Sequence, residues 1–518
     1  MFQAAAMMLP HGISDKIREP FFLLQYADDT MLFSTAKGIA VQLAKQVLDT
    51  FSLVSGISLN SNKSCFITFN ITKRQQEGIK AILQMEATVL PFNYLGLPLT
   101  LRKPERLMYQ ALIDKVQCRL AGWKSSMLSR AGRVVLASSV LSTIPIYFMS
   151  VFKLPTWVVK ALDRLRRDFI WGSSNNSGRS MHLLSWDRVC LPKPLGGFGL
   201  LDLRLHNIAL LLRWWWRLHH DPDTLWSKLA RRLFAKRDVN LPPLAWNLCG
   251  SFFWKDLLSL RFYFQLSSTS VIGTGLNTLF WYNNWGGTPL FYCLSHPKPP
   301  SRRFITLRAA VPLLQELLPA PLTLQQSNLV ELANNLNFST LPDRVDWRWT
   351  NHGKYSAAST YKAFMFSGKV LSPLRFLWKI KIPPSVKLFL LLLAHGRLLT
   401  QDQLLRRNIP CTQGCVMCTQ MICETAGHLF LDCTFATRLW NVLGYPESGS
   451  DPNASLQDKL LTRFAAANNS ADKLALIATT FWGLWLERNN RVFRNQSRHL
   501  GAVHHWIICE STLFVKYC

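Results

Sequence analysis

Four potential metal ligands stand close together in the last quarter of the chain: Cys415, Cys418, His428 and Cys433, with the spacing C-x2-C-x9-H-x4-C. Two thiolates separated by two residues can hold one metal ion from a tight turn, and the later His and Cys can supply the two opposing ligands. Four such ligands complete a tetrahedral Zn2+ shell and leave no open position, which is typical of a structural site. The spacing therefore predicts a small domain folded around one zinc ion.

Two other cysteines leave the ligand set open. Cys411 and Cys423 flank the motif, and either could replace one of the four ligands. The alternative to a metal site is a group of small thiols buried in a core. Twelve cysteines in 518 residues are too sparse for a disulfide scaffold, so their clustering favours metal binding in a reducing compartment.

A second motif lies near the beginning of the chain, where Asp28 and Asp29 separate two apolar runs, 21–24 and 31–33. This pattern predicts a hairpin of two short strands with an acidic tip. Paired carboxylates can hold divalent metals such as Mg2+, which orient and polarise a phosphoryl group during nucleotide addition. The alternative is an ordinary turn, because Asp is a common turn residue.

The order of the following motifs resembles a known family. Gln25 to Thr30 is followed by Ser55-Gly56-Ile57, Asn60 to Ser64 and Tyr94 to Leu99, and these words are similar to the last palm motifs of a plant non-LTR retrotransposon reverse transcriptase. The resemblance implies that Asp28 and Asp29 belong to the catalytic metal site. It also implies that Lys63 contacts the nucleotide or protonates the pyrophosphate, and that Gly96 lies where the primer strand is gripped.

The next segment predicts three helices, 105–122, 130–143 and 156–171, the last with Thr156 as its N-cap. An earlier helix is predicted over 39–55 and ends at Gly56. The bundle resembles the family's thumb, which implies contact with the template–primer duplex. The basic residues expected to make this contact are Lys115, Arg119, Lys124, Arg130 and Arg133. The alternative is a solvated face of an amphipathic bundle.

Charge indicates the class of partner. The chain has 59 Lys and Arg against 30 Asp and Glu, a net charge of +29, which favours RNA and DNA as partners. No signal peptide and no apolar stretch long enough to cross a membrane is present in the sequence. We therefore expect an intracellular protein, nuclear or cytoplasmic and not secreted, whose oligomeric state the sequence does not reveal.

The rest of the chain gives weaker signals. Residues 172–350 are rich in Trp, Gly and Pro and poor in periodicity, and the glycines at 196–199 lack the strand and helix that frame a phosphate loop. Gly273-Thr274-Gly275 and Trp285 resemble the connector region of plant elements. Short sequence segments around the cysteine motif resemble the zinc-binding domain that follows the polymerase, including Trp482 to Trp485 and Glu487-Arg488-Asn489.

The predicted fold is α+β and mostly helical. We expect a partial reverse transcriptase palm at 1–100, a thumb-like helical bundle at 101–172, an irregular connector at 173–345, a zinc-binding domain at 346–445 and a helical segment at 446–518.

One requirement of polymerase chemistry is missing from this sequence. A two-metal site needs a further carboxylate from an earlier strand, but the acids before Tyr26 are Asp15 and Glu19, and neither lies in an apolar strand. We therefore expect a truncated, retrotransposon-derived reverse transcriptase with a structural zinc, weakly held Mg2+ and no polymerisation by itself. The alternative is a zinc-stabilised nucleic-acid-binding protein with no catalytic role.

Overall fold

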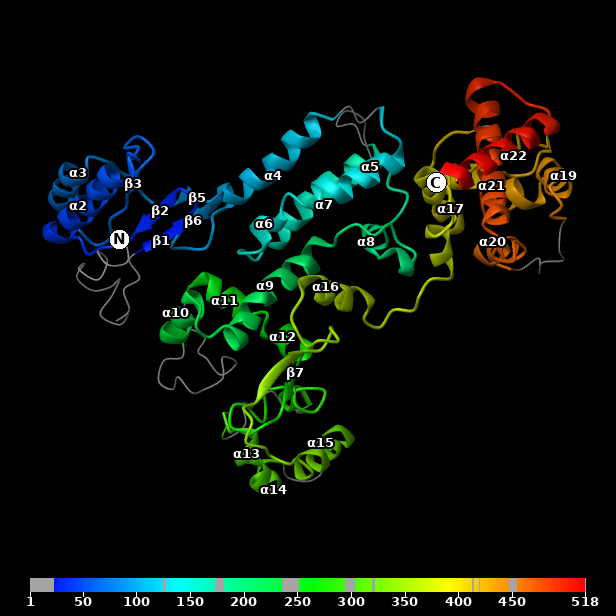
Figure 1. Ribbon diagram of the computed structural model, residues 1–518. Coiled ribbons are helices and arrows are strands. Elements are labelled where there is room, and N and C mark those ends of the chain that lie inside the picture. The colour runs from blue at the N-terminus through cyan, green and yellow to red at the C-terminus, as the bar shows by residue number, and fades with distance from the viewer. Residues whose placement is uncertain are drawn as a thin grey trace. The chain divides into compact units, whose positions relative to one another are not determined.

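The computed structural model describes residues 23–123, 127–172, 181–234, 251–293, 302, 304–318, 322–411, 414–418, 420–446 and 454–517. The described chain is mostly helical, and its strands form four two-stranded sheets (Figure 1). This confirms the prediction of a mostly helical α+β protein. The chain divides into two compact units, one made of residues 1–109 and 211–356 and the other of 110–210 and 357–518. The finer division into palm, thumb and connector stays a prediction.

The first part of unit 1 contains the short strands and two helices. Its elements are β1 Leu23–Tyr26, β2 Asp29–Leu32, α2 Gly38–Ser55, β3 Cys65–Phe66, α3 Lys73–Leu83, β4 Glu86–Ala87, β5 Phe92–Tyr94 and β6 Leu97–Leu99. The predicted acidic hairpin is confirmed, because β1 and β2 pair antiparallel with Tyr26 opposite Asp29. The predicted helix is confirmed as α2, and Gly56 ends it in the left-handed conformation.

The second part of unit 1 has an aromatic core. Its elements are the end of α9 Leu203–His220, then α10 Leu225–Phe234, α11 Phe252–Leu258, α12 Arg261–Ser267, β7 Ser268–Val271, η5 Leu290–Cys293, α13 Leu307–Ala310, η6 Val311–Leu313, α14 Leu314–Leu317, α15 Leu324–Asn334 and β8 Arg344–Trp347. Trp215 packs against Trp254 and Phe264, with ring centroids 5.7 and 5.9 Å apart, and Phe264 contacts Trp347. The apolar residues of α9 are spread around the helix. It therefore lacks the single apolar stripe along one face that would have predicted it as a helix.

The connector-like glycine motif has a structural role. The Asp343 carboxylate accepts hydrogen bonds from the backbone N–H groups of Gly273, Gly275 and Asn277 at 2.8 to 2.9 Å. A Cβ at Gly273 would lie 2.0 Å from the Leu341 carbonyl oxygen, so only glycine fits there. The motif therefore binds a carboxylate of its own chain.

Unit 2 begins with the predicted bundle. Its elements are α4 Arg106–Ala121, which starts in unit 1, then α5 Arg130–Leu136, the π-turn η2 Ala137–Leu141, α6 Ile146–Met149, α7 Thr156–Trp171, α8 Trp186–Cys190 and η3 Lys193–Leu195. The three predicted helices are confirmed as α4, α5 with η2, and α7. The N-cap of α7 is Pro155, so the assignment of Thr156 as the cap was wrong by one residue. Proline is suited to this position because its fixed φ precedes the first helical turn without needing an N–H donor.

The remainder of unit 2 holds the cysteine motif. Its elements are α16 Ala357–Phe366, η7 Pro373–Trp378, α17 Pro384–Ala394, α18 Gln401–Leu405, η8 His428–Asp432, α19 Thr434–Val442, α20 Leu456–Ala465, α21 Ala471–Arg494 and α22 Leu500–Tyr517. Helix α17 is buried over nearly its whole surface and packs beside α21 (Figure 1). Phe430, Trp440 and Phe481 join the cysteine segment to α21. Among the described residues, no helix combines the length and apolarity that crossing a membrane requires.

Candidate metal centre and predicted polymerase residues

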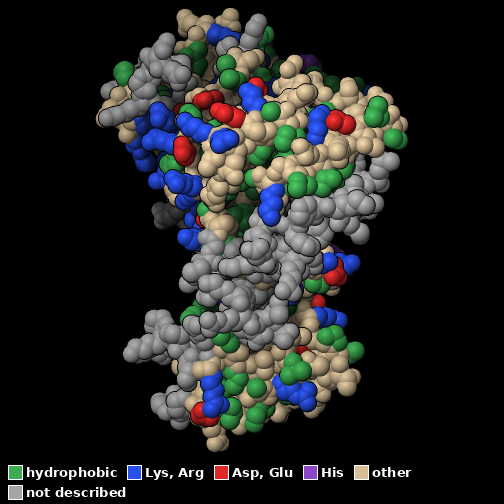
Figure 2. Space-filling model, turned by 90° about the vertical axis from the view of Figure 1, so that its left-hand side faces the viewer, with side chains coloured by type: hydrophobic (Ala, Val, Ile, Leu, Met, Phe, Trp, Pro, Cys, Tyr) green, Lys and Arg blue, Asp and Glu red, His purple; other side chains and the backbone are tan. Residues whose placement is uncertain are grey.

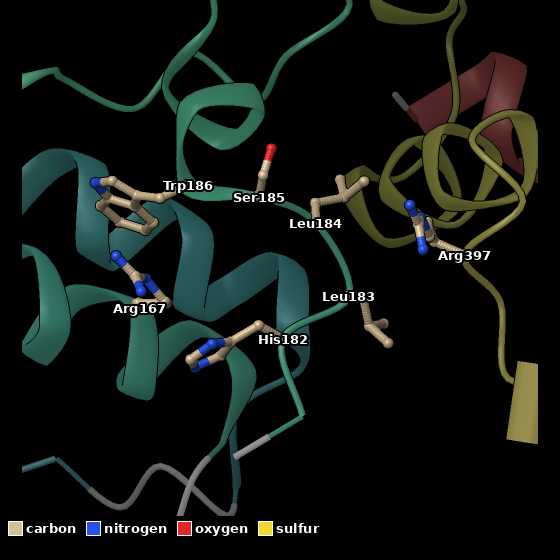
Figure 3. A pocket seen from close by; sticks show the side chains of 7 residues that line it. All are labelled: Arg167, His182, Leu183, Leu184, Ser185, Trp186 and Arg397. Carbon is tan, nitrogen blue, oxygen red and sulfur yellow. The ribbon is translucent and has the colours of Figure 1, made fainter. Parts of the chain in front are cut away.

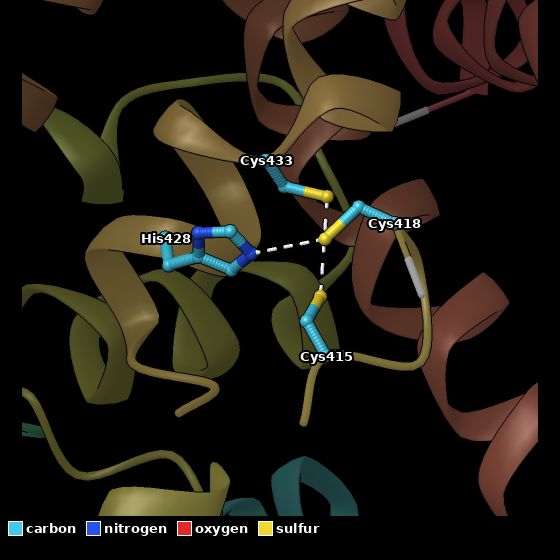
Figure 4. A group of neighbouring side chains, drawn as sticks. All are labelled: Cys415, Cys418, His428 and Cys433. Atoms are coloured by element: carbon cyan, nitrogen blue, oxygen red, sulfur yellow. Dashed lines mark hydrogen bonds between the residues drawn. The ribbon is translucent and has the colours of Figure 1, made fainter. Parts of the chain in front are cut away.

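The four cysteine-motif residues converge on one point. Their ligand atoms all lie within 4.8 Å of one another, and the side chains point toward one another (Figure 4). Cys415 and Cys418 come from one turn, His428 begins η8, and Cys433 precedes α19. Cys415 and Cys433 are buried, and Cys418 and His428 are half-buried. The short η8 turn is what returns the chain, because the Cys433 N–H donates to the His428 carbonyl at 2.7 Å.

The interatomic distances fit a tetrahedral zinc shell. Zn–S bonds of about 2.3 Å and a Zn–N bond of about 2.0 Å place two sulfurs about 3.8 Å apart and a sulfur about 3.5 Å from a nitrogen. The Cys415 and Cys433 Sγ atoms are 3.9 Å apart, and the Cys418 Sγ lies 3.4 Å from the His428 Nε2. A hydrogen bond from Cys415 lowers the pKa of Cys433 and, together with burial, raises the pKa of Cys415. The donor set therefore supports one structural zinc ion.

The two alternative cysteines lie outside this group. Within the described ranges, the group close enough to hold a metal contains the four residues above and excludes Cys411 and Cys423. Cys411 is half-buried and Cys423 is exposed. The geometry thus favours the ligand set that the spacing alone left open.

Helix α21 holds the cysteine turn through Arg491. The Arg491 Nη1 donates to the carbonyl oxygens of Val416 and Met417, both at 3.2 Å, and these are the two residues between the first pair of cysteines. The Glu487 carboxylate, fully buried, accepts from the Arg491 Nε at 2.9 Å and from the Arg498 Nε at 3.0 Å. Burial alone would raise the pKa of Glu487, but hydrogen bonds from Arg498 and Arg491 lower it. Glu487 is therefore an ionised anchor that orients Arg491 against the turn.

A second ion pair holds the segment between the turn and His428. The Arg488 guanidinium binds the Glu424 carboxylate through Nε at 3.0 and 3.1 Å and through Nη2 at 2.8 Å. Both side chains are buried, at 7% and 2% exposure, and Arg488 lies over the Trp485 ring. The sequence named Glu487 and Arg488 only as part of a motif that resembles the zinc-binding domain, and it predicted none of these contacts. The Glu487–Arg491 spacing of four residues on one helix was the signal that could have found the first pair.

The structure places Asp28 and Asp29 at the tip of the β1–β2 hairpin. Both are exposed, and the preceding Ala27 has a positive φ of 50°, which allows the tight turn. No third His, Cys, Asp or Glu of the described residues joins them in a group that could hold a metal. Asp15 and Glu19 lie outside the described residues. Mg2+ binding by this pair stays a prediction.

Lys63 and Gly96 both lie in exposed turns. The Asn60 Oδ1 accepts from the backbone N–H groups of Asn62 and Lys63, which fixes the turn and leaves the Lys63 side chain exposed. Leu95 and Gly96 both have positive φ, 51° and 77°, in the two-residue turn between β5 and β6. This combination is a type I′ turn, which explains the glycine by backbone geometry alone. The predicted roles of both residues at a nucleotide or primer stay untested.

The predicted duplex-binding cations differ in their surroundings. Lys115 and Arg119 on α4 and Arg130 on α5 are exposed, and Lys124 lies outside the described residues. Arg133 is half-buried against Gly172 at the C-terminal end of α7, where a cation is favoured by the helix dipole.

Comparison with known proteins connects this geometry to a family. Residues 355–440 match the family described as zinc-binding in reverse transcriptase. Over 365 residues the chain is 26% identical to a putative ribonuclease H protein of Arabidopsis thaliana, which covers 66% of this chain and 57% of that protein. Over 143 residues it is 29% identical to an uncharacterized mitochondrial protein of Arabidopsis thaliana, covering 27% of this chain and 92% of that protein.

The chain thus spans a little more than half the length of the first of these relatives. The matched family segment contains all four predicted zinc ligands, whereas Glu487, Arg488 and Arg491 lie beyond its end. The resemblance to the reverse transcriptase region of plant retrotransposons is confirmed, and the chain contains a segment that matches the zinc-binding domain of reverse transcriptases.

Proposed function

We propose that this protein, derived from a non-LTR retrotransposon, binds RNA and DNA through a basic surface and uses its zinc ion to stabilise the fold. The observation that carries the proposal is the Cys3His group, whose atoms have zinc-like spacing inside a segment that matches a reverse-transcriptase zinc-binding family. An intracellular location, nuclear or cytoplasmic, is part of the proposal.

The role of the zinc is structural because its shell is closed. Three cysteines and one histidine fill the four tetrahedral positions, so no position remains for a water or a substrate. Three thiolates and a neutral imidazole give the site a net charge of about −1 with Zn2+, which the Arg491 guanidinium beside the turn complements. We expect one zinc per chain by metal analysis of the purified protein, and folded protein that lacks zinc would contradict this assignment.

The charge of the chain supports nucleic acid as the partner. Figure 2 shows many Lys and Arg side chains on the displayed face, with a smaller number of acidic side chains among them. The net charge of +29 predicts that affinity for single-stranded RNA falls steeply as salt rises, because phosphate contacts release counterions. Fluorescence anisotropy with a labelled RNA at several salt concentrations measures this slope. Undetectable or salt-independent binding would refute a nucleic-acid partner.

We further propose that the 518-residue polypeptide does not polymerise by itself. Two exposed carboxylates on one hairpin hold metal ions weakly unless a third carboxylate completes the site, and the described residues bring none beside Asp28 and Asp29. Primer extension on an RNA template with Mg2+ should therefore give no product. Nucleotide incorporation that Asp28→Asn abolishes would show that the acidic pair is a working polymerase site.

The second candidate function is nucleic-acid binding in which the β1–β2 hairpin has no catalytic role. The exposure of Asp28, Asp29 and Lys63 favours it, because a functioning polymerase centre shields its reacting groups from water. RNA affinity distinguishes the candidates. Under this second function, Asp28→Asn leaves RNA affinity unchanged with and without Mg2+, whereas a retained metal site makes the affinity depend on both.

A further inference from the structure

A polar pocket of about 260 Å³ lies within unit 2, and none of the residues that line it is a metal ligand. Arg167 lines it from α7, His182 to Trp186 line it from the following segment, and Arg397 lines it from the turn after α17 (Figure 3). Arg397 lies on the opposite side of Leu183 and Leu184 from Arg167 and His182. The pocket is smaller than the usual range for whole small-molecule ligands, about 300 to 1,000 Å³.

The arginines of this pocket are not neutralised. Neighbouring Arg166 is neutralised within the fold, since it pairs with Asp163 and its Nη1 donates to the Ser142 hydroxyl and to the Leu201 carbonyl at 2.9 Å, although its Nε is also buried without a partner among the described residues. By contrast, the guanidinium groups of Arg167 and Arg397 have no ion pair within the part of the chain that the structure describes. The Arg167 Nε is buried without a hydrogen-bond partner, and its guanidinium rests over the Trp186 ring at 5.4 Å.

Further basic side chains interact electrostatically with Arg397 or its neighbours. The Arg188 Nη1 lies 3.1 Å from the His395 Nδ1, and burial together with the charges of Arg188 and Arg397 lowers the pKa of His395. Burial and the charge of Arg397 also lower the pKa of Arg407. The carboxylates that contact the pocket's surroundings are already engaged: Asp168 is shared by His182 at 3.3 Å and Arg164 at 3.7 Å, and Asp163 pairs with Arg166 and accepts from the Trp186 side chain. Cations crowded in this way repel one another, and a bound anion would relieve that repulsion.

We propose that this pocket binds one phosphodiester group of a nucleic-acid backbone. The planar guanidinium forks of Arg167 and Arg397 match the oxygens of a phosphate, and the Ser185 hydroxyl can donate a further hydrogen bond. A pocket of this size holds a phosphate with part of its sugar and leaves the bases outside, so the contact positions a strand without reading its sequence. The inference rests on the proposed nucleic-acid function and names one site where that function acts.

The test uses the zinc-loaded full chain and a labelled single-stranded RNA in a salt-dependent anisotropy assay. Arg167→Gln, Arg397→Gln and the double variant remove the pocket cations, and Arg204→Gln is the control because Arg204 is exposed on α9 of the same unit and loses the same charge. If both arginines hold one phosphate, each single variant makes the plot of log affinity against log salt shallower by about 0.7, and the double variant adds little more. The double variant should lose about tenfold in affinity, whereas Arg204→Gln stays close to the wild type.

A second pair of variants keeps the test valid if an arginine variant folds poorly. Ser185 is exposed and precedes α8, a position where Asp and Asn are equally good helix caps. Ser185→Asp adds a negative charge at the pocket and should weaken RNA binding about tenfold, while Ser185→Asn should not. Suppose that the wild type binds RNA with a steep salt slope and that the Arg167→Gln, Arg397→Gln and Ser185→Asp variants bind RNA with the same affinity and slope. This result would overturn the phosphate site in the pocket and leave the proposed function standing. Wild-type protein that does not bind RNA would overturn both.

Discussion

The contact between Arg491 and the cysteine turn gives the sharpest prediction. Arg491→Met keeps the length of the side chain and removes the guanidinium, so the Val416 and Met417 carbonyls lose their donor. The buried Glu487 carboxylate also loses one of its two arginine partners. Breaking a buried pair costs about 3 to 5 kcal/mol, and the remaining Arg498 contact places the expected cost near the lower end, at about 3 kcal/mol.

This loss should appear in zinc affinity. Metal binding and folding of the turn are coupled, and about 1.4 kcal/mol corresponds to a factor of ten, so Arg491→Met should weaken zinc binding on the order of 100-fold. Competition with a chromophoric chelator measures the affinity directly. The lysine of Arg491→Lys can reach Glu487 or a carbonyl with its one ammonium group. The zinc affinity of this variant should therefore lie between those of the wild type and Arg491→Met.

The matched control lies one turn along the same helix. Arg494 is exposed and contacts only Asn490, at 3.5 Å, among the interactions described for its side chain, so Arg494→Met removes the same charge without touching the turn. Its zinc affinity should equal that of the wild type. If Arg491→Met binds zinc as tightly as Arg494→Met does, the reasoning that α21 holds the metal site is refuted.

Three further predictions concern stability. Replacing Cys415 and Cys418 by Ser should release the zinc and unfold the surrounding segment, which metal analysis and circular dichroism would detect; a cooperative, zinc-free fold would contradict it. Gly483→Ala should destabilise unit 2 by about 1 to 3 kcal/mol in urea unfolding, because its Cβ would lie 2.9 Å from Ile507, whereas Gly501→Ala, with its nearest atom at 3.5 Å, should not. Burial lowers the pKa of His219 to about 3 from an ordinary value of about 6.5, so the unfolded chain binds the proton more readily and unit 1 should lose stability as pH falls from 6.5 toward 3. A His219→Phe variant should lose this part of the pH dependence in thermal unfolding, and an unchanged profile would exclude the histidine as its cause.

Local sequence signals predicted much of the secondary structure. The apolar spacing of α2, α4 and α7 and the glycine after α2 were sufficient for the helices, because each of them is set by contacts within a few residues. The β1–β2 hairpin was likewise predicted from the two apolar runs on either side of its two aspartates. The helices between 172 and 350 were not, since in Trp-rich segments such as α9 the apolar residues are spread around the helix and form no single stripe.

Parts of the site depended on distant residues. The cysteine spacing indicated four ligands but could not exclude Cys411 or Cys423, because all six residues lie within one short stretch. The choice follows from the η8 turn, which brings His428 and Cys433 back to the first pair. The contacts of Arg491, Arg488 and Arg133 could not be predicted either, because the sequence does not show whether a basic side chain faces solvent or a carbonyl oxygen.

By itself, the sequence determined that this chain is helical, basic, equipped for one zinc ion and related to plant retrotransposon reverse transcriptases. The first three properties follow from composition and short-range spacing, which no packing arrangement can change, and the relationship was implied by the resemblance of its motifs to that family. The tertiary structure decided which cations serve the fold and which remain unneutralised: Arg488 and Arg491 are used by buried glutamates, whereas Arg167 and Arg397 face a pocket without an acid. The physical reason is that the free energy of a charge depends on the groups and the solvent around it, and segments more than 60 residues apart supply those groups.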